Sequence, residues 1–120
     1  MQITFDDLNK EIAESFDTLS VDFGGEVVEF ANPQLLERKE RDEVRELINI
    51  FIEGFFDEDG KLLEERANDE EEAVESIAAV LRQVCVSGNF DLVEAELGKV
   101  FVKWMFLWGT WNKALQVGEA

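Results

Sequence analysis

The most hydrophobic part of this sequence reads Val100-Phe101-Val102-Lys103-Trp104-Met105-Phe106-Leu107-Trp108-Gly109-Thr110-Trp111. At 100° per residue, one broad face of a helix through it collects side chains that we expect to be buried: Val100, Phe101, Trp104, Met105, Leu107, Trp108, Trp111 and Leu115. The opposite side carries Val102 and Phe106 beside Lys103. A helix with apolar side chains on two sides is either central in a bundle or carries a docking surface.

A second long helical pattern lies upstream, over residues 33–56. Asn32 followed by Pro33 is the usual opening of a helix, a capping residue and then a proline in the first turn. Ile50 and Phe56 stand away from the main stripe, so this helix also has apolar residues on two sides. The main stripe holds whether or not the helix breaks near Lys39, and it consists of Val44, Leu47, Ile48, Phe51 and Phe55.

The strongest strand signal in the chain surrounds two glycines. Apolar and polar residues alternate on both sides of Gly24-Gly25, and glycines supply the positive backbone torsions of a tight turn. We therefore expect a short β-hairpin at about residues 19–30. It follows a helix over residues 5–17, which Thr4 is placed to cap.

Two more helical stretches complete the chain. Asn68 or Asp69 caps the first of them, and Gly88 ends it in the usual C-terminal position. Asn89 can cap the second, which covers residues 90–112, and Gly98 is a point at which it can be interrupted.

Together these patterns predict a mainly α protein, a small bundle of four to five helices with a short N-terminal β-hairpin. A length of 120 residues is that of one domain. We expect a single helical domain over residues 1–112 and a C-terminal tail over residues 113–120. The loop 57–68 is the one candidate for a hinge.

The charge of the chain restricts its partners. Twenty-eight acidic residues against 11 basic ones give a formal net charge of −17, which repels nucleic acid and anionic lipid. The most hydrophobic stretch is too short to span a bilayer, and the N-terminus lacks the apolar run of a signal peptide. We expect no nucleic-acid partner and no membrane partner. The single cysteine, Cys85, favours the cytoplasm.

The composition argues against catalysis. The chain has no histidine and no tyrosine, which removes the commonest general base near neutral pH and the phenol acid. Cys85 falls on the apolar face of its helix, so we expect a core residue and not a nucleophile. Asp57 to Gly60 resembles part of a calcium loop, but the register places Phe55 and Arg66 at ligand positions. We therefore predict a non-enzyme with no catalytic, cofactor-binding or metal-binding residue.

The surplus apolar residues define the predicted partner-binding site. Four or five helices in so short a chain leave little room for one that is wholly enclosed. We therefore expect Ile50, Phe56, Val102 and Phe106 to contribute to self-association or to the binding of an amphipathic partner helix in a groove.

Three stretches, read in order, resemble the tail assembly chaperones of long-tailed actinobacteriophages. The first is Phe5-Asp6-Asp7-Leu8 running into Lys10-Glu11-Ile12, followed by the glycine hairpin at residues 21–28. The second is the charged helix that begins Leu35-Leu36-Glu37-Arg38-Lys39-Glu40-Arg41. The third is the tryptophan-bearing helix and the ending Gln116-Val117-Gly118-Glu119-Ala120, similar to the family's glutamine-x-Gly-Glu-Ala.

The resemblance implies a function in phage assembly. Proteins of this family bind the tape measure protein, keep it soluble and assist assembly of the tail tube in the host cell cytoplasm. The tail tube protein and a second copy of the chain are further candidate partners. The rival interpretation is an acidic nucleic-acid mimic that inhibits a DNA-binding protein, with residues 57–72 supplying phosphate-like spacing.

Overall fold

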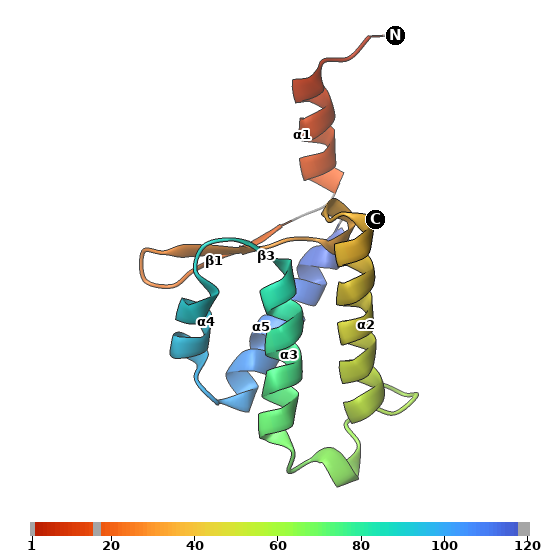
Figure 1. The fold of residues 1–120 in the computed structure, drawn as a ribbon, viewed down its shortest axis with the longest axis vertical. Helices are drawn as coiled ribbons and strands as arrows, with labels where there is room; N and C mark the ends of the chain where they lie inside the picture. The colour runs from red at the N-terminus through yellow and green to blue at the C-terminus, as the bar shows by residue number, and fades with distance from the viewer. Residues whose placement is uncertain (1, 16–17, 118–120) are drawn as a thin grey trace.

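The computed structural model describes residues 2–15 and 18–117, and these residues are mostly helical with one small antiparallel sheet (Figure 1). This confirms the predicted mainly α class and its N-terminal hairpin. Within these residues, no helix is both long and apolar enough to cross a membrane. The elements in chain order are α1 (Phe5–Ser15), β1 (Leu19–Asp22), β2 (Val27–Phe30), the short 3-10 helix η1 (Pro33–Leu35), α2 (Arg38–Phe55), a second 3-10 helix η2 (Glu64–Arg66), α3 (Glu70–Val84), β3 (Cys85–Ser87), α4 (Phe90–Leu97) and α5 (Phe101–Val117).

The predicted hairpin is present. β1 and β2 pair antiparallel in a register that sets Val21 opposite Val28. Gly24 and Gly25 both have positive φ, and the Gly25 amide donates to the Asp22 carboxylate at 2.7 Å. The turn therefore closes with local groups that the sequence already specifies.

A third strand was not predicted. The prediction that Gly88 ends a helix containing Cys85 is wrong, because α3 ends at Val84 and the chain continues as β3 beside β2. The Ala31 amide donates to the Val84 carbonyl at 2.8 Å. This hydrogen bond joins the backbone just after β2 to the last residue of α3. Cys85 is a half-buried strand residue that packs against the core, and not a helical one.

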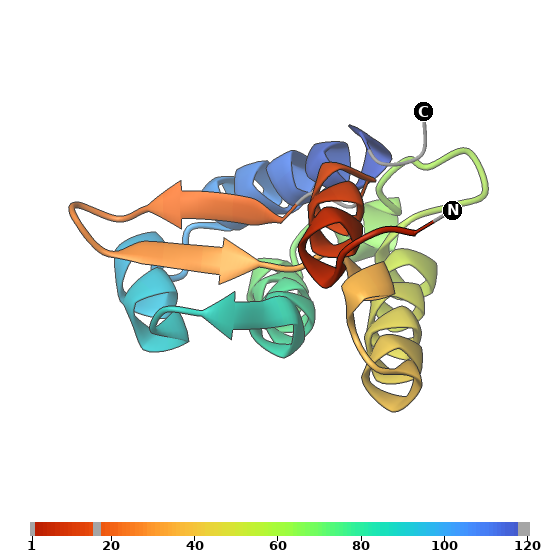
Figure 2. The same cartoon turned by 90° about the horizontal axis from the view of Figure 1, so that it is seen from above.

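The core lies between the sheet and the helices. The strand order is β1-β2-β3, and α3 packs against α2 on one side and α5 on the other (Figures 1 and 2). The largest fully buried side chains come from both layers: Trp104, Trp111, Phe30, Phe51, Ile77 and Leu81. Their burial is the dominant favourable contribution to folding.

The helix expected over residues 33–56 is divided. Asn32 caps only η1, where its side chain accepts from the Gln34 amide at 3.0 Å. Leu36 and Glu37 are extended, and α2 begins after them. Leu36 packs against the core from this extended segment.

Near the C-terminus, the last helical stretch is interrupted where the sequence allows it, and it extends beyond its predicted end. Gly98 interrupts the last helical stretch with a φ of +56°, which separates α4 from α5. α5 then continues to Val117, so residues 113–117 are helical and do not form a tail. At the other end, α1 stops at Ser15, and residues 16–17 of the predicted helix lie outside the described part of the chain.

The loop over residues 57–68 is tied down and is not a free hinge. Arg66 places its guanidinium 4.2 Å from the centre of the Phe55 ring. It also forms ion pairs with Asp69 at 3.3 Å and with Glu72 at 3.0 Å. These contacts fix the loop to the end of α2 and the start of α3.

α1 stands apart from this body (Figure 1). The radius of gyration is 15.9 Å, larger than the roughly 14 Å expected for a compact chain of this length. The longest dimension is 57 Å and the shortest is 24 Å. The excess length follows from α1, which extends beyond the sheet on the side away from α3 and α5 (Figures 1 and 2).

Candidate functional site

α5 has an inner face and an outer face. Trp104 and Trp111 point into the core and are almost wholly buried. Val102 and Phe106, one turn apart on the other side, are 67% and 78% exposed. We call Val102, Lys103 and Phe106 the α5 outer face.

Two indole hydrogen bonds fix the orientation of α5. The Nε1 of Trp104 donates to the Gly98 carbonyl at 2.9 Å, and the Nε1 of Trp111 donates to the Ala31 carbonyl at 3.2 Å. Buried indole N–H groups normally need such an acceptor. Rotation of α5 about its axis would break both bonds and expose both rings, so Val102 and Phe106 are held toward solvent.

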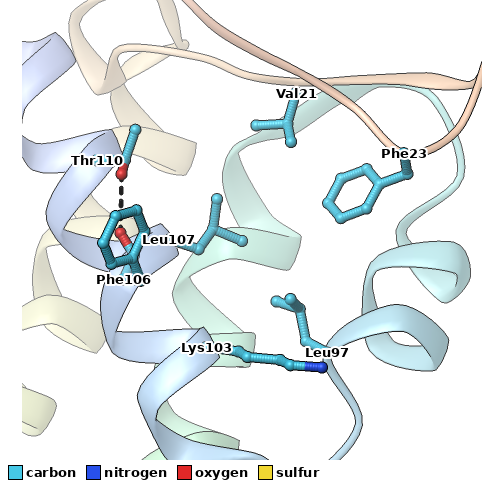
Figure 3. A pocket seen from close by; sticks show the side chains of 7 residues that line it. All are labelled: Val21, Phe23, Leu97, Lys103, Phe106, Leu107 and Thr110. Carbon is cyan, nitrogen blue, oxygen red and sulfur yellow. Dashed lines mark hydrogen bonds between the residues drawn. The ribbon is translucent and has the colours of Figure 1, made fainter.

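An apolar pocket of about 400 Å³ opens beside the outer face (Figure 3). The β1 hairpin forms one wall, the end of α4 contributes a second, and α5 forms the third. Its lining is almost entirely apolar. The lining residues are Val21, Phe23, Leu97, Lys103, Phe106, Leu107 and Thr110.

The edge of the pocket near Phe106 is locally reinforced. The Thr110 hydroxyl donates to the Phe106 carbonyl at 2.9 Å, which satisfies the hydroxyl within its own helix (Figure 3). The ring of Phe106 remains largely exposed at the pocket's rim, and Lys103 lies at the same opening. The arrangement offers a partner an aromatic surface, an apolar hollow and a cation within two turns of helix.

The charge of α5 is opposite to that of the rest of the protein. α5 contains Lys103 and Lys113 and no acidic residue, whereas each of the other four described α-helices has more acidic than basic residues. A net charge of −17 repels most acidic partners from the chain. The α5 outer face therefore presents exposed apolar side chains beside a cation on a strongly acidic protein.

The structure does not bring all four predicted partner-binding residues together. Ile50 is 57% exposed, but it lies in a shallow groove between α2 and α3. That groove has carboxylates along both sides and shares no residue with the pocket beside Phe106. Its lining includes Glu43, Glu46, Glu72 and Glu75.

Phe56 has a largely structural environment. Its ring is half-buried and meets the ring of Phe51 edge-on at 5.4 Å. Its backbone pairs with Leu62 in an isolated β-bridge. Phe56 therefore closes one end of the core, and Val102 and Phe106 are the two predicted residues that share one exposed surface.

Sequence reasoning did not identify two of the three walls of the pocket, those formed by the hairpin and by the end of α4. Val21 lies in β1 and Phe23 directly follows it, both in an alternating apolar pattern, and Leu97 continues the apolar pattern of α4. Each has the sequence signal of a core residue. Only the packing of the hairpin over α5 shows that they also border an opening.

Among the described residues, no group of three histidine, cysteine or acidic side chains is arranged to hold a metal ion. Burial raises the pKa of the Cys85 thiol, against weaker lowering effects of the Ser87 backbone hydrogen bond and the Arg82 charge. A raised pKa disfavours the nucleophilic thiolate at neutral pH.

Comparisons with protein-family models, with curated proteins and with solved structures find no significant match to this chain.

Proposed function

We propose that this protein is a non-catalytic helix-binding protein, and specifically a phage tail assembly chaperone. In this proposal it binds the tape measure protein in the host cytoplasm, keeps it soluble and assists assembly of the tail tube around it. The helices α2, α3 and α5 serve as a small bundle that presents the binding surface.

The observation that carries the proposal is the exposure of Val102 and Phe106 beside an apolar pocket. Exposed apolar area of this kind usually marks an interaction site. An amphipathic helix fits such a site because its side chains at three- and four-residue spacing reach the pocket and the neighbouring ridge together. A long helical tape measure protein offers many segments of that pattern.

The remaining surface suits a holding protein. Acidic side chains outnumber basic ones on the other helices, and their mutual repulsion opposes uncontrolled aggregation of the chain. A chaperone needs both properties, since it must expose apolar surface to its client without aggregating.

The direct test is co-expression with the tape measure protein encoded nearby in the same genome. The expected result is a soluble complex with the wild-type chain and an insoluble tape measure protein without it. Val102→Asp combined with Phe106→Asp should abolish the complex, because two carboxylates would have to be desolvated at the interface. Circular dichroism should show that this variant keeps its helicity.

Two further variants sharpen the test. Ile52→Asp changes another exposed apolar residue on α2 and should leave the complex intact. Ile50→Asp reports separately on the groove between α2 and α3. Failure of the wild-type chain to solubilise the tape measure protein would remove the chaperone assignment, and unfolding of the α5 double variant would show that its residues stabilise the core instead.

The groove between α2 and α3 favours a second candidate function, that of an acidic nucleic-acid mimic. Four glutamates line it, as a basic partner would require: Glu43, Glu46, Glu72 and Glu75. Salt distinguishes the two functions. The affinity for a basic groove on a DNA-binding partner should fall steeply between low and moderate salt, whereas the affinity for an apolar helix should change little.

A further inference from the structure

α1 is an amphipathic helix whose described apolar side chains are exposed in the monomer. Phe5 is 75% exposed and Leu8 is 41% exposed, and the two lie three residues apart on one side of the helix. An isolated helix of 11 residues is marginal in water, because few hydrogen bonds offset the cost of nucleation. α1 therefore gains stability if its apolar side docks on another surface.

Charge indicates which surface that is. α1 carries four acidic residues and one lysine, so it is repelled by most of this acidic protein. The α5 outer face combines exposed apolar side chains with Lys103, and Lys113 lies on the same side of α5. The two helices are therefore complementary in both polarity and charge.

The position of α1 determines which copy it reaches. α1 extends from the sheet on the side opposite α5, so the helix runs away from the α5 of its own chain (Figures 1 and 2). A second copy can approach this projecting helix without rearrangement of its own core. Two copies can make this contact reciprocally, with the α1 of each copy meeting the α5 outer face of the other. Such a reciprocal contact would form a closed, two-fold dimer.

We propose that α1 of one copy docks Phe5 and Leu8 on the α5 outer face and pocket of a second copy. The inference rests on the proposed function in assigning helix binding to that surface. In the free protein, the second copy's α1 covers the site that a client helix would otherwise occupy. A client must then displace α1, so self-association and client binding compete.

Cross-linking of the full-length chain tests this contact directly. In a Cys85→Ser background, a Leu8→Cys chain mixed with a Phe106→Cys chain should form a disulfide-linked heterodimer under mild oxidation. The Leu8→Cys chain mixed with an Ile50→Cys chain is the matched control, because Ile50 is exposed on the other groove. Equal cross-linking to both positions would overturn the proposal. So would a chain carrying both Leu8→Cys and Phe106→Cys that closes the disulfide within a single copy.

Sedimentation velocity provides the second measurement. The wild-type chain should sediment as a concentration-dependent dimer, and Phe5→Asp with Leu8→Asp should weaken that dimer about ten-fold or more. These side chains are exposed, so the variant should keep the fold of the body. A wild-type chain that stays monomeric, or a dimer that the variant leaves unchanged, would overturn the proposal.

The same variant separates this inference from the proposed function. If both hold, the α1 variant should bind the tape measure protein at least as tightly as the wild-type chain, because its site is no longer covered. Specific cross-linking without any tape measure binding would retain the α1 contact and remove the chaperone assignment. Tape measure binding without dimerisation would retain the chaperone assignment and remove the α1 contact.

Discussion

The indole of Trp111 donates a hydrogen bond of 3.2 Å to the carbonyl of Ala31, a residue 80 positions earlier in the chain. Both residues are buried. The bond joins α5 to the segment that follows β2, and so it connects the helix carrying the candidate site to the sheet. The orientation of the α5 outer face depends on this contact as well as on the burial of the tryptophan rings.

Replacing Trp111 with phenylalanine should destabilise the protein. The Ala31 carbonyl would lose its indole donor in a buried setting, which costs about 1–3 kcal/mol before the smaller ring is considered. Urea unfolding followed by circular dichroism measures the change. The matched control is Trp108→Phe, because Trp108 is only half-buried and should cost less. Equal losses would show that ring volume, and not the hydrogen bond, dominates.

Gly88 should not tolerate alanine. Its φ is +89°, and an added Cβ would lie 2.5 Å from the Val27 carbonyl oxygen and 2.8 Å from the Val28 Cα. Strained backbone alone costs about 1–3 kcal/mol, and the collision with β2 adds to it. Gly54→Ala is the control, since Gly54 lies in the last turn of α2 and a Cβ there meets nothing within 4 Å. Thermal unfolding should show a lower Tm for Gly88→Ala and an unchanged or higher Tm for Gly54→Ala.

Arg66→Met should loosen the loop that follows α2. The substitution keeps an apolar side chain over Phe55. It removes the cation, and with it both ion pairs to carboxylates. We expect a loss of about 1–2 kcal/mol. Hydrogen exchange of the Arg66 to Asp69 amides should speed up more than exchange in α3. Arg38→Met is the comparison, because the Arg38 pair with Asp42 is highly exposed and contributes little.

Cys85 should make stability fall at alkaline pH. Burial raises the pKa of its thiol in the folded chain, so the folded state binds this proton more tightly than the unfolded state. The resulting stabilisation is complete below the unfolded pKa and is lost as pH rises through the folded pKa. Urea midpoints measured across that alkaline range should therefore fall more for the wild-type chain than for Cys85→Ser. Parallel curves for the two proteins would contradict this prediction.

Local signals in the sequence located most of the elements. Asn89 caps α4 through the Asp91 amide at 3.0 Å, as its position before an apolar stretch predicts. β3 was missed because the apolar period of α3 runs on through Cys85. A strand of three residues has no period of its own, and it exists because β2 supplies a pairing edge.

The candidate site was also predictable from the sequence only in part. The helical period alone separates Val102 and Phe106 from the tryptophans of α5, so the sequence identifies that surface. It also groups Ile50 and Phe56 with them, although the structure places Ile50 in another groove and Phe56 at the edge of the core. Side-chain period gives a direction around one helix, and it gives no distance between two helices.

The sequence by itself determined the mainly helical class, the glycine hairpin, the strongly acidic charge and the surplus apolar side of α5. Those features depend on residue type and on spacing within a few turns of chain. Only the tertiary structure decided that the hairpin forms one wall of a pocket beside Phe106 and that α1 extends away from α5. These relationships join segments far apart in the chain, and their geometry follows from how the whole core packs.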